Sequence, residues 1–256
     1  MNVSKHATID PSAELGKNVT IGPYTVIGPN VRIGDGCEVG PSAVIEKGTV
    51  IGNNCRIYHG ASIGGDPQIA NFKEVNSWVE IGDDTTIREF VTLHRGGTES
   101  AVTRIGSHCM LMNYVHVAHD CQIGNHVTVV NSTGLSGHIV VEDYAFISGF
   151  VAVHQFVRIG AYSMTQGMSA IGQDILPYSL VGGWPAELVS LNSVGLRRRD
   201  FAPKTRTAIK SAFKILKKED LNTSQAIEKI ESEIEMSEEI RYLIDFIRNS
   251  KRGFSK

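Results

Sequence analysis

The chain of 256 residues has little cysteine, proline or aromatic side chain, with 4 Cys, 8 Pro and 7% Phe, Trp and Tyr. So few cysteines exclude a small scaffold held together by disulfides. No run of roughly eighteen apolar residues is present, which excludes a transmembrane helix. The net charge of -2 argues against a nucleic-acid-binding protein. The segment Met1–His6 lacks the apolar run of a secretory signal, so we expect a cytoplasmic protein with no integral membrane segment.

What the sequence does contain is a period of six. An aliphatic residue stands at every sixth position without exception at Ile9, Leu15, Ile21, Ile27, Ile33, Val39, Ile45, Ile51, Ile57 and Ile63. The same phase returns from Ile81 to Ile171, where Thr165 interrupts the later run. Neither an α-helix nor an alternating strand has this period. It predicts a parallel β-helix in which three hexads form a triangular coil of about 18 residues, with coils stacked about 4.8 Å apart.

Two further positions of the hexad carry information. The fourth residue after the aliphatic one is small, as in Ala13 and Thr25, and is expected to face the narrow interior. All the cysteines fall there: Cys37, Cys55, Cys109 and Cys121. We interpret them as buried thiols in a reducing compartment rather than as disulfides, metal ligands or nucleophiles. Glycine often follows the aliphatic residue directly, as at Gly22 and Gly124, and we expect it to provide unusual backbone angles at a corner.

Two polar stretches, at about 64–78 and 96–103, interrupt the repeat without changing its phase. We expect them to be loops that leave the coil and return in register. Surface loops on a rigid scaffold are frequent carriers of binding residues. The β-helical domain is predicted to span 1–190, and residues 174–196, which contain prolines and glycines, are expected to be irregular.

A C-terminal α-helical domain is predicted at 191–256. Its apolar spacing indicates one helix from Pro203 to Leu216, a second capped by Thr223, and a third after Ser237. The stretch 195–218 contains nine Lys or Arg residues against one acid, Asp200. Such a run is commonly a solvated helix face, but this imbalance also favours an anionic partner. Because aromatic residues are sparse there, phosphates or an acidic protein fit better than nucleic acid.

The histidines point to chemistry. A residue 18 positions later lies above its equivalent on the next coil, so His119, His138 and Gln155 should share one corner of three successive coils. Three interpretations are open: polar corner residues, a zinc site, or general base catalysis. The third has support from Asp120, which can orient the neighbouring imidazole, and from Gly137, whose N–H could stabilise an oxyanion. Since no Ser or Cys is obviously paired with this base, direct transfer fits better than a covalent intermediate.

Four motifs then reveal a resemblance that spans nearly the whole chain. They are His116-Val117-Ala118-His119-Asp120-Cys121, Leu135-Ser136-Gly137-His138, Ala152-Val153-His154-Gln155-Phe156, and Ile87 to Gly96 (IREFVTLHRG). The chain resembles the bacterial UDP-N-acetylglucosamine O-acyltransferase family, which performs the first step of lipid A synthesis. The resemblance implies a left-handed β-helix and a homotrimer with active sites between neighbouring coils. It also implies transfer of an (R)-3-hydroxyacyl chain from acyl carrier protein to the 3-position of the nucleotide sugar, with no metal and no cofactor beyond the carrier's phosphopantetheine.

The resemblance assigns roles by motif. It makes His119 the general base, Asp120 its orienting group and Gly137 the oxyanion donor. Residues that it places at the sugar or the acyl donor are His116, His138, His154 and Gln155, with Gln68 and Lys73 from the first loop. It assigns the uridine and diphosphate to Asn192, Arg198 and Arg199, and the rest of the basic tail to the acidic carrier protein. Gly167 falls at the acyl-chain ruler position, where a glycine predicts a longer chain.

The first loop departs from the family pattern. Where relatives commonly read Gln-Asp-Leu-Lys, this chain reads Gln68-Ile69-Ala70-Asn71, and Val194 replaces a glutamate of some members. An isoleucine cannot accept a hydrogen bond from a sugar hydroxyl. An alternative acceptor is therefore a 3-amino nucleotide sugar, giving an amide, with acyl carrier protein or coenzyme A as donor. A non-catalytic β-helical scaffold is the alternative from another class, and the retained histidines and basic tail disfavour it.

Overall fold

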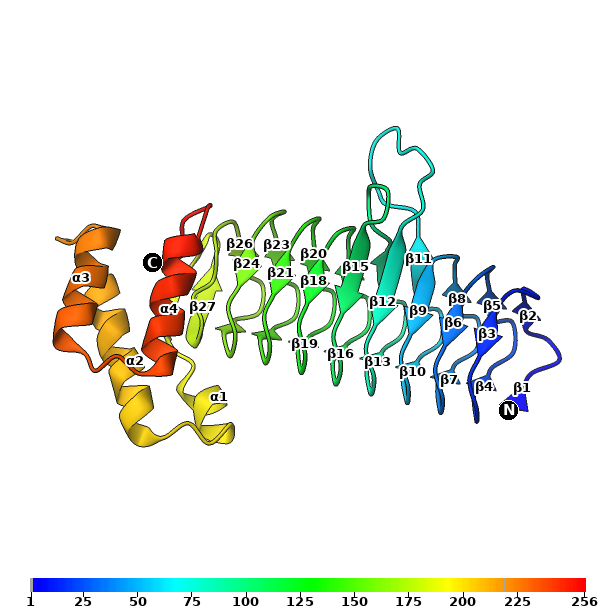
Figure 1. The fold of residues 1–256 in the computed structure, drawn as a ribbon, viewed down its shortest axis with the longest axis horizontal. Helices are drawn as coiled ribbons and strands as arrows, with labels where there is room; N and C mark the ends of the chain where they lie inside the picture. The colour runs from blue at the N-terminus through cyan, green and yellow to red at the C-terminus, as the bar shows by residue number, and fades with distance from the viewer. Residues whose placement is uncertain (1, 219) are drawn as a thin grey trace.

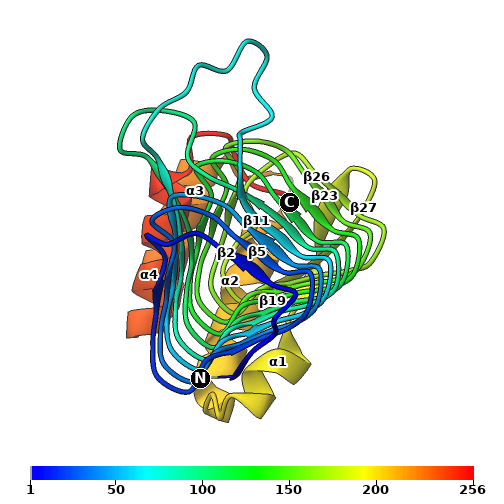
Figure 2. The ribbon, with the colours of Figure 1, turned by 90° about the vertical axis from the view of Figure 1, so that its right-hand side faces the viewer.

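The architecture follows from the hexad. In a two-residue strand such as β4 (Thr20–Ile21) the second side chain is buried and the first is only partly covered, so each hexad contributes one inward aliphatic residue. The computed structural model describes residues 2–218 and 220–256, which form a long triangular β-helix with a cluster of helices at its C-terminal end (Figure 1). Figure 2, a view along the β-helix, shows the triangular cross-section.

Each face of the triangle is one sheet. Sheet A contains β1 (Asn2–Val3), β4, β7 (Glu38–Val39), β10 (Arg56–Ile57), β13 (Thr86–Ile87), β16 (Met110–Leu111), β19 (Thr128–Val129), β22 (Phe146–Ile147), β25 (Met164–Thr165), β27 (Ser179–Gly183) and β28 (Ala186–Leu191). Sheet B contains β2 (Thr8–Ile9), β5 (Val26–Ile27), β8 (Val44–Ile45), β11 (Ser62–Gly65), β14 (Thr92–His94), β17 (His116–Val117), β20 (Gly134–Leu135), β23 (Ala152–Val153) and β26 (Ala170–Ile171). Sheet C contains β3 (Glu14–Leu15), β6 (Arg32–Ile33), β9 (Thr49–Ile51), β12 (Trp78–Ile81), β15 (Val102–Ile105), β18 (Gln122–Ile123), β21 (Val140–Val141) and β24 (Arg158–Ile159). The predicted left-handed parallel β-helix is confirmed.

The two loops leave the coil and return to it in register, as the unchanged phase of the repeat predicted. The coil continues in parallel register across both of them, because Arg56 pairs with Thr86 and Thr86 pairs with Met110. The loops are shorter than predicted: they run over residues 66–77 and 95–101, since β12 and β15 extend further than a typical hexad strand. Both leave the corner between sheets B and C and project from the same edge of the molecule (Figures 1 and 2). The loops therefore lie beside one corner of the β-helix.

The expected reason for the hexad glycines holds only at Gly64, whose φ is +86°, and is wrong for the others. Positive φ angles occur instead at the third residue after the aliphatic one, occupied by residues such as Asn30, Asp120 and His138. The glycines that directly follow the aliphatic residue serve close approach between coils. A Cβ on Gly22 would lie 2.7 Å from the backbone nitrogen of Pro41 on the next coil, and one on Gly106 would clash with the Gly124 carbonyl oxygen. A stack with a spacing of about 4.8 Å leaves no room for a side chain there.

The interior is filled as the repeat predicted. The aliphatic positions from Ile21 onward are buried, and the four cysteines are buried and unpaired. Thr165, the exception in the aliphatic series, is fully buried, and its hydroxyl accepts a hydrogen bond of 3.0 Å from the Ser148 N–H. Its polar atom is therefore satisfied, as burial requires.

Strand β6 offers a matched test of the inward and outward positions. Ile33 is 3% exposed, whereas the adjacent Arg32 points outward and makes an exposed ion pair with Glu14 at 3.9 Å. Ile33→Ala is expected to lower the free energy of unfolding by about 3 kcal/mol through lost burial and a cavity. Arg32→Ala should cost less than about 1 kcal/mol, since exposed ion pairs contribute little. Urea denaturation of both variants measures the difference, and equal losses would contradict the assigned orientation.

The segment 174–196 is not irregular, and the prediction for it is wrong. Strands β27 and β28 form an antiparallel hairpin, with β27 parallel to β25, and helix α1 (Ser193–Arg198) follows. Local pattern missed the hairpin because its pairing partner, Met164–Thr165, belongs to the preceding coil. The hairpin extends sheet A past the last hexad and places α1 beside the outer surface of that sheet.

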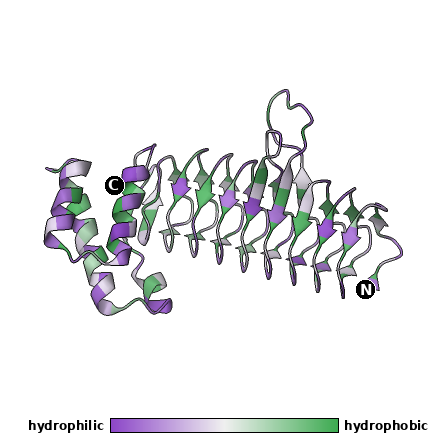
Figure 3. Cartoon of the chain, in the orientation of Figure 1, coloured by the Kyte–Doolittle hydropathy of each residue, from purple (hydrophilic) through white to green (hydrophobic). Residues whose placement is uncertain are grey.

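The remaining helices are α2 (Pro203–Leu216), α3 (Thr223–Glu233) and α4 (Glu238–Asn249). The bounds of α2 and the predicted helix after Ser237 are confirmed, and the Ser237 side chain caps that helix. The cap of α3, by contrast, is Asn222, not Thr223; its side chain accepts from the Gln225 N–H. Figure 3 shows that these helices have one apolar and one polar face. Among the described residues no helix could span a membrane. The division into domains at residue 190 stays a prediction.

Candidate active site

The predicted base lies at the corner between β17 and β18, beside the loops. His119 Nδ1 is 2.6 Å from Asp120 Oδ2, and the two side chains are only 17% and 14% exposed. Since the carboxylate can only accept, Nδ1 carries the proton and Nε2 remains a free acceptor. Asp120 is itself held, because its N–H donates to Thr103 Oγ1 at 2.8 Å and its carboxylate accepts from the Gly97 N–H at 3.2 Å.

Gly137 and His138 lie on the next coil, directly against this pair. A Cβ on Gly137 would be 2.8 Å from His119 Cε1 and 2.9 Å from Nε2, so the imidazole rests on the glycine. Within the described residues, the Gly137 N–H makes no hydrogen bond. The His138 ring is perpendicular to that of His119, with centroids 5.1 Å apart, and its Nε2 is 3.7 Å from Asp120 Oδ2. We call His119, Asp120, Gly137 and His138 the histidine corner.

The predicted column at this corner is shifted by one residue. His138 lies above Asp120 in the stack, and Phe156, not Gln155, lies above His138, with ring centroids 4.7 Å apart and nearly parallel planes. Gln155 belongs to the neighbouring column with His119 and Gly137, and its side chain is exposed. Phe156 was not among the predicted residues of this corner, although its spacing of 18 from His138 places it there.

His116 and His154 flank the corner on sheet B. His116 Nδ1 is 2.8 Å from Thr92 Oγ1, and burial lowers its pKa. His154 is exposed, with Nδ1 3.0 Å from the Gln155 carbonyl oxygen and 3.3 Å from the Arg252 guanidinium. His154 also lines an apolar groove with Trp184, Pro185 and others. Both residues therefore lie on the face beside the predicted base.

His94 is a further histidine of this group that motif reasoning did not select. Its ring packs edge-on against His116 at 5.0 Å, and its buried Nδ1 has no hydrogen-bond partner within the described residues. Burial first, then the nearby His116 and His119, lowers the pKa of His94 to about 4. A neutral His94 therefore adds no positive charge beside the predicted base at neutral pH.

The lowered pKa of His94 predicts a pH-dependent stability. Between about pH 6.5 and 4 the unfolded chain binds a proton at this residue and the folded chain does not, so stability falls as pH falls through that window. From pH 7 to 5 this residue should account for a loss of about 2 kcal/mol. His94→Asn is expected to reduce the pH dependence by that amount in urea denaturation at the two pH values. An unchanged slope in the variant would contradict a neutral buried imidazole.

The first loop carries Gln68 and Lys73, both exposed. Its Ile69 packs toward the second loop, since a Cβ on Gly97 would lie 2.8 Å from Ile69 Cδ1. The same Cβ would be 3.0 Å from Asp120 Oδ2, so the first loop reaches the histidine corner. The isoleucine that departs from the family pattern thus sits over the backbone that holds Asp120.

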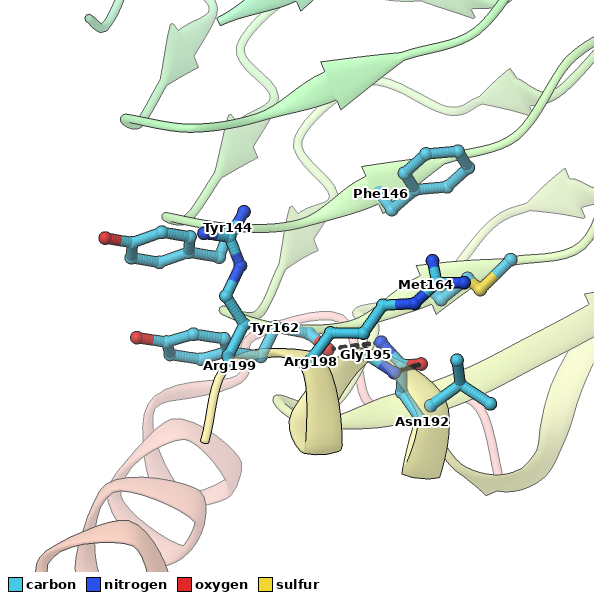
Figure 4. Close-up of a pocket in the computed structure, with 9 residues that line it drawn as sticks. Tyr144, Phe146, Tyr162, Met164, Asn192, Gly195, Arg198 and Arg199 are labelled. Carbon is cyan, nitrogen blue, oxygen red and sulfur yellow. Dashed lines mark hydrogen bonds between the residues drawn. The ribbon is translucent and has the colours of Figure 1, made fainter. Parts of the chain in front are cut away.

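Asn192, Arg198 and Arg199 form a second group, in α1 and at its two caps, away from the histidine corner. With Tyr144, Phe146, Tyr162 and Met164 they line a cavity of about 430 Å³, which we call the arginine pocket (Figure 4). Arg199 lies over the Tyr144 ring at 4.6 Å. Asn192 is 8% exposed, donates to the Tyr162 carbonyl oxygen at 2.9 Å and accepts from the Gly195 N–H at 3.1 Å.

Within one chain the two groups do not meet. His119 lies between a strand of sheet B and one of sheet C, whereas Tyr144 lies between sheet C and sheet A. Gly167, the predicted ruler residue, lies near the third corner, where, among the described residues, a Cβ would meet only the Gly149 carbonyl oxygen at 3.3 Å. The predicted site residues are therefore spread over different corners of the triangle.

The donor atoms of His119, Asp120 and His138 all lie within 4.8 Å of one another, the only such grouping among the described residues. Three ligands of this kind could hold a metal ion. However, His119 Nδ1 and the Asp120 carboxylate already form a short hydrogen bond with each other. A metal bound through Nδ1 would displace that bond, and the same bond orients Nε2 as a base, so the arrangement suits a base with an orienting carboxylate better.

Comparison with known proteins agrees with these observations. Residues 174–255 match the family described as UDP N-acetylglucosamine O-acyltransferase, domain 2, and residues 103–137 match the bacterial transferase hexapeptide. Residues 3–97, which also lie in the hexad repeat, match the C-terminal domain of GMPPB. The family-specific match therefore covers the hairpin and the helices, and the more general matches fall on the repeat.

Solved structures extend the match over the whole chain. UDP-N-acetylglucosamine acyltransferase from Bacteroides fragilis is 44% identical, with a TM-score of 0.97 and 99% of each chain covered. The enzyme of the same name from Francisella novicida is 35% identical, with a TM-score of 0.92, covering 99% of this chain and 93% of its own.

Curated relatives carry the same name in fuller form. The acyl-[acyl-carrier-protein]–UDP-N-acetylglucosamine O-acyltransferase of Syntrophobacter fumaroxidans is 44% identical over 73% of each chain. That of Thermodesulfovibrio yellowstonii is 46% identical over 74% of each chain. Identity at this level over nearly three quarters of both proteins, with the same fold from end to end, means that the chain belongs to the UDP-N-acetylglucosamine O-acyltransferase family.

Proposed function

We propose that this protein transfers an (R)-3-hydroxyacyl chain from acyl carrier protein to the 3-hydroxyl of UDP-N-acetylglucosamine, the first step of lipid A synthesis. The observation that carries the proposal is the pair His119–Asp120, with Nδ1 fixed at 2.6 Å from the carboxylate and Nε2 free to take a proton. The names of the curated relatives, all O-acyltransferases, favour an ester product over the amide of a 3-amino sugar.

In this mechanism His119 Nε2 removes the proton of the sugar 3-hydroxyl, and the oxygen attacks the thioester carbonyl carbon. The Gly137 N–H donates to the oxygen that becomes negative. Collapse of the intermediate breaks the carbon–sulfur bond, and the phosphopantetheine thiol leaves with the proton from His119. Asp120 keeps the imidazole in the required tautomer and stabilises its protonated form.

The other residues of this region bind substrate in our proposal. His116, His138, Gln155 and His154 face the sugar or the acyl donor beside the base, and Gln68 and Lys73 reach over the sugar from the first loop. Gly167 leaves its corner open, which supports a longer acyl chain. The basic stretch from Arg197 through α2 offers a positive surface to the acidic carrier protein.

The arginine pocket suits the uridine diphosphate. Arg198 and Arg199 offer guanidinium groups for bidentate contacts with phosphate oxygens, and Tyr144 and Phe146 offer aromatic surface to the uracil. Because Asn192, Arg198 and Arg199 lie away from His119 in one chain, we propose a homotrimer. There the histidine corner of one subunit would face the arginine pocket of its neighbour, and the nucleotide sugar would span the two.

We place the reaction in the cytoplasm, in keeping with four buried cysteines that are all unpaired. The chemistry proposed needs no metal, since the proton, the nucleophile and the oxyanion are all handled by protein groups. Prolonged dialysis against EDTA is therefore expected to leave kcat within about twofold of the untreated protein, because no catalytic metal would be removed. A loss restored by zinc but not by magnesium would instead assign His119, Asp120 and His138 to a metal.

One assay separates the candidate functions. Purified protein is incubated with UDP-N-acetylglucosamine or its 3-amino analogue, and with hydroxyacyl-acyl carrier protein or acetyl-coenzyme A. We expect product from hydroxyacyl-acyl carrier protein and UDP-N-acetylglucosamine. Product only with acetyl-coenzyme A, or only with the amino sugar, would overturn the proposal, and no product with any pair would favour a binding scaffold.

A further inference from the structure

Arg95 is among the largest fully buried side chains of the protein, with only 1% of its surface exposed. It directly follows β14, at the base of the loops 66–77 and 95–101. A buried guanidinium is costly unless its charge and its donors are matched. Its burial beside the histidine corner therefore calls for a physical reason.

The side chain of Arg95 holds the first loop at both of its ends. One terminal nitrogen lies 2.6 Å from Asp66 Oδ1, at the start of the loop, and 2.9 Å from Glu74 Oε1, near its end. The other donates to the Val75 carbonyl oxygen at 2.7 Å and to Ser77 Oγ at 3.0 Å. Its backbone N–H donates to the Gly65 carbonyl oxygen at 3.1 Å.

This contact set needs the planar fork of an arginine. Four acceptors on opposite ends of the loop are reached at once, and the guanidinium also lies over the Phe72 ring at 5.2 Å. The two carboxylates remain 63% and 56% exposed, so water solvates them while the guanidinium is enclosed. A lysine could keep the charge but not the forked geometry.

The second loop connects Arg95 to the His119–Asp120 pair. Gly97, two residues after Arg95, donates its N–H to the Asp120 carboxylate at 3.2 Å. A Cβ on Gly97 would lie 2.8 Å from Ile69 Cδ1 and 3.2 Å from His119 Nδ1. The Gly97 backbone thus lies between the first loop and the His119–Asp120 pair. Displacement of the first loop would remove the packing on one side of Gly97.

We propose that Arg95 is a positioning residue for acyl transfer. By closing the base of both loops it keeps the Gly97 N–H on Asp120, and it keeps Gln68 and Lys73 over the sugar. The inference rests on the function proposed above. It differs from a purely structural role, in which loss of Arg95 would lower stability without changing substrate binding or the pH dependence of the reaction.

The decisive variant is Arg95→Met, which keeps the length of the side chain and removes the fork. We expect KM for UDP-N-acetylglucosamine to rise about tenfold and kcat to fall about tenfold, because a displacement near 1 Å can cost up to a hundredfold in rate. Arg95→Lys should give intermediate values. The matched control is Arg104→Met, which removes an exposed arginine paired with Glu80 at 2.6 Å and should keep the wild-type constants.

The pH profile of kcat/KM distinguishes the two roles, because it would stay unchanged if Arg95 only stabilised the fold. Without the Gly97 donor, Asp120 holds the protonated His119 more tightly, so the acidic limb of the profile should move to higher pH. The other titratable groups that face this pair, His138 and His94, are unchanged in the variants. A wild-type limb together with a wild-type KM in Arg95→Met would overturn the proposal.

Glu74→Gln covers the case in which Arg95→Met does not fold. It leaves Arg95 in place and weakens one exposed anchor of the loop, and should raise KM for the nucleotide sugar about threefold. A wild-type KM and a wild-type acidic limb in this variant would equally count against a positioning role. Inactivity of the wild-type protein in the same assay would instead overturn the proposed function.

Discussion

His119→Ala is expected to lower kcat about a thousandfold, within the range that general base catalysis contributes. The imidazole is the only group at the histidine corner with both a fixed orienting carboxylate and a free acceptor nitrogen. The residue is 17% exposed at a corner, and its loss leaves the interior aliphatic positions untouched. The melting temperature and oligomeric state should therefore stay at the wild-type values.

The matched control is His108→Ala. His108 also lies beside a carboxylate, with Nδ1 3.8 Å from Asp84 Oδ2, but at a different corner of the β-helix and with 51% of its side chain exposed. It should keep the wild-type rate. Steady-state kinetics with hydroxyacyl-acyl carrier protein and UDP-N-acetylglucosamine measures both variants, and a His119→Ala protein within tenfold of wild type would rule out His119 as the base.

Gly137→Ala is expected to lower kcat about a hundredfold with little loss of stability. The added Cβ would lie 2.8 Å from His119 Cε1, which is closer than van der Waals contact allows. The imidazole must move, and a shift near 1 Å in a catalytic group can cost that much. Because alanine retains the backbone N–H, the predicted oxyanion donor is still present, and the variant tests the space rather than the donor.

Gly149→Ala is the control for this substitution. Gly149 occupies the equivalent turn position at another corner. Of the residues that the structure describes, a Cβ there would meet only the Asn131 carbonyl oxygen at 3.2 Å and Val130 Cγ1 at 3.4 Å. Its kcat should stay within about threefold of wild type. Equal activity of the two alanine variants would mean that the His119 ring does not depend on the space above Gly137.

His119→Ala and Gly137→Ala both change the contact between the His119 ring and Gly137. His119 is held from one side by Asp120 and rests on Gly137 from the other, so the position of Nε2 is fixed by two successive coils. This explains why a β-helix suits the proposed reaction. Backbone hydrogen bonds between the coils, such as His138 N–H to the His119 carbonyl oxygen at 3.1 Å, set the height of each side chain at the corner.

The amino-acid sequence alone determined the β-helix, because a period of six places an inward aliphatic residue in every strand wherever the phase holds. The same period predicted that Cys37 and Cys121 are buried in the interior and that His119 and His138 lie at one corner. It would also have found Phe156, 18 residues beyond His138. These features depend only on spacing along the chain, because in a stack of equal coils the sequence position of a residue gives both its coil and its face of the triangle.

The tertiary structure alone decided what lies between the repeats. The hairpin of β27 and β28 depends on pairing with β25, and the enclosure of Gly97 depends on two loops meeting over Asp120. Arg95 gains its partners from residues 18 to 29 positions away in a segment without periodicity. No spacing rule applies to loops, because their contacts are set by side-chain packing, and so the surroundings of the predicted base emerged only from the fold.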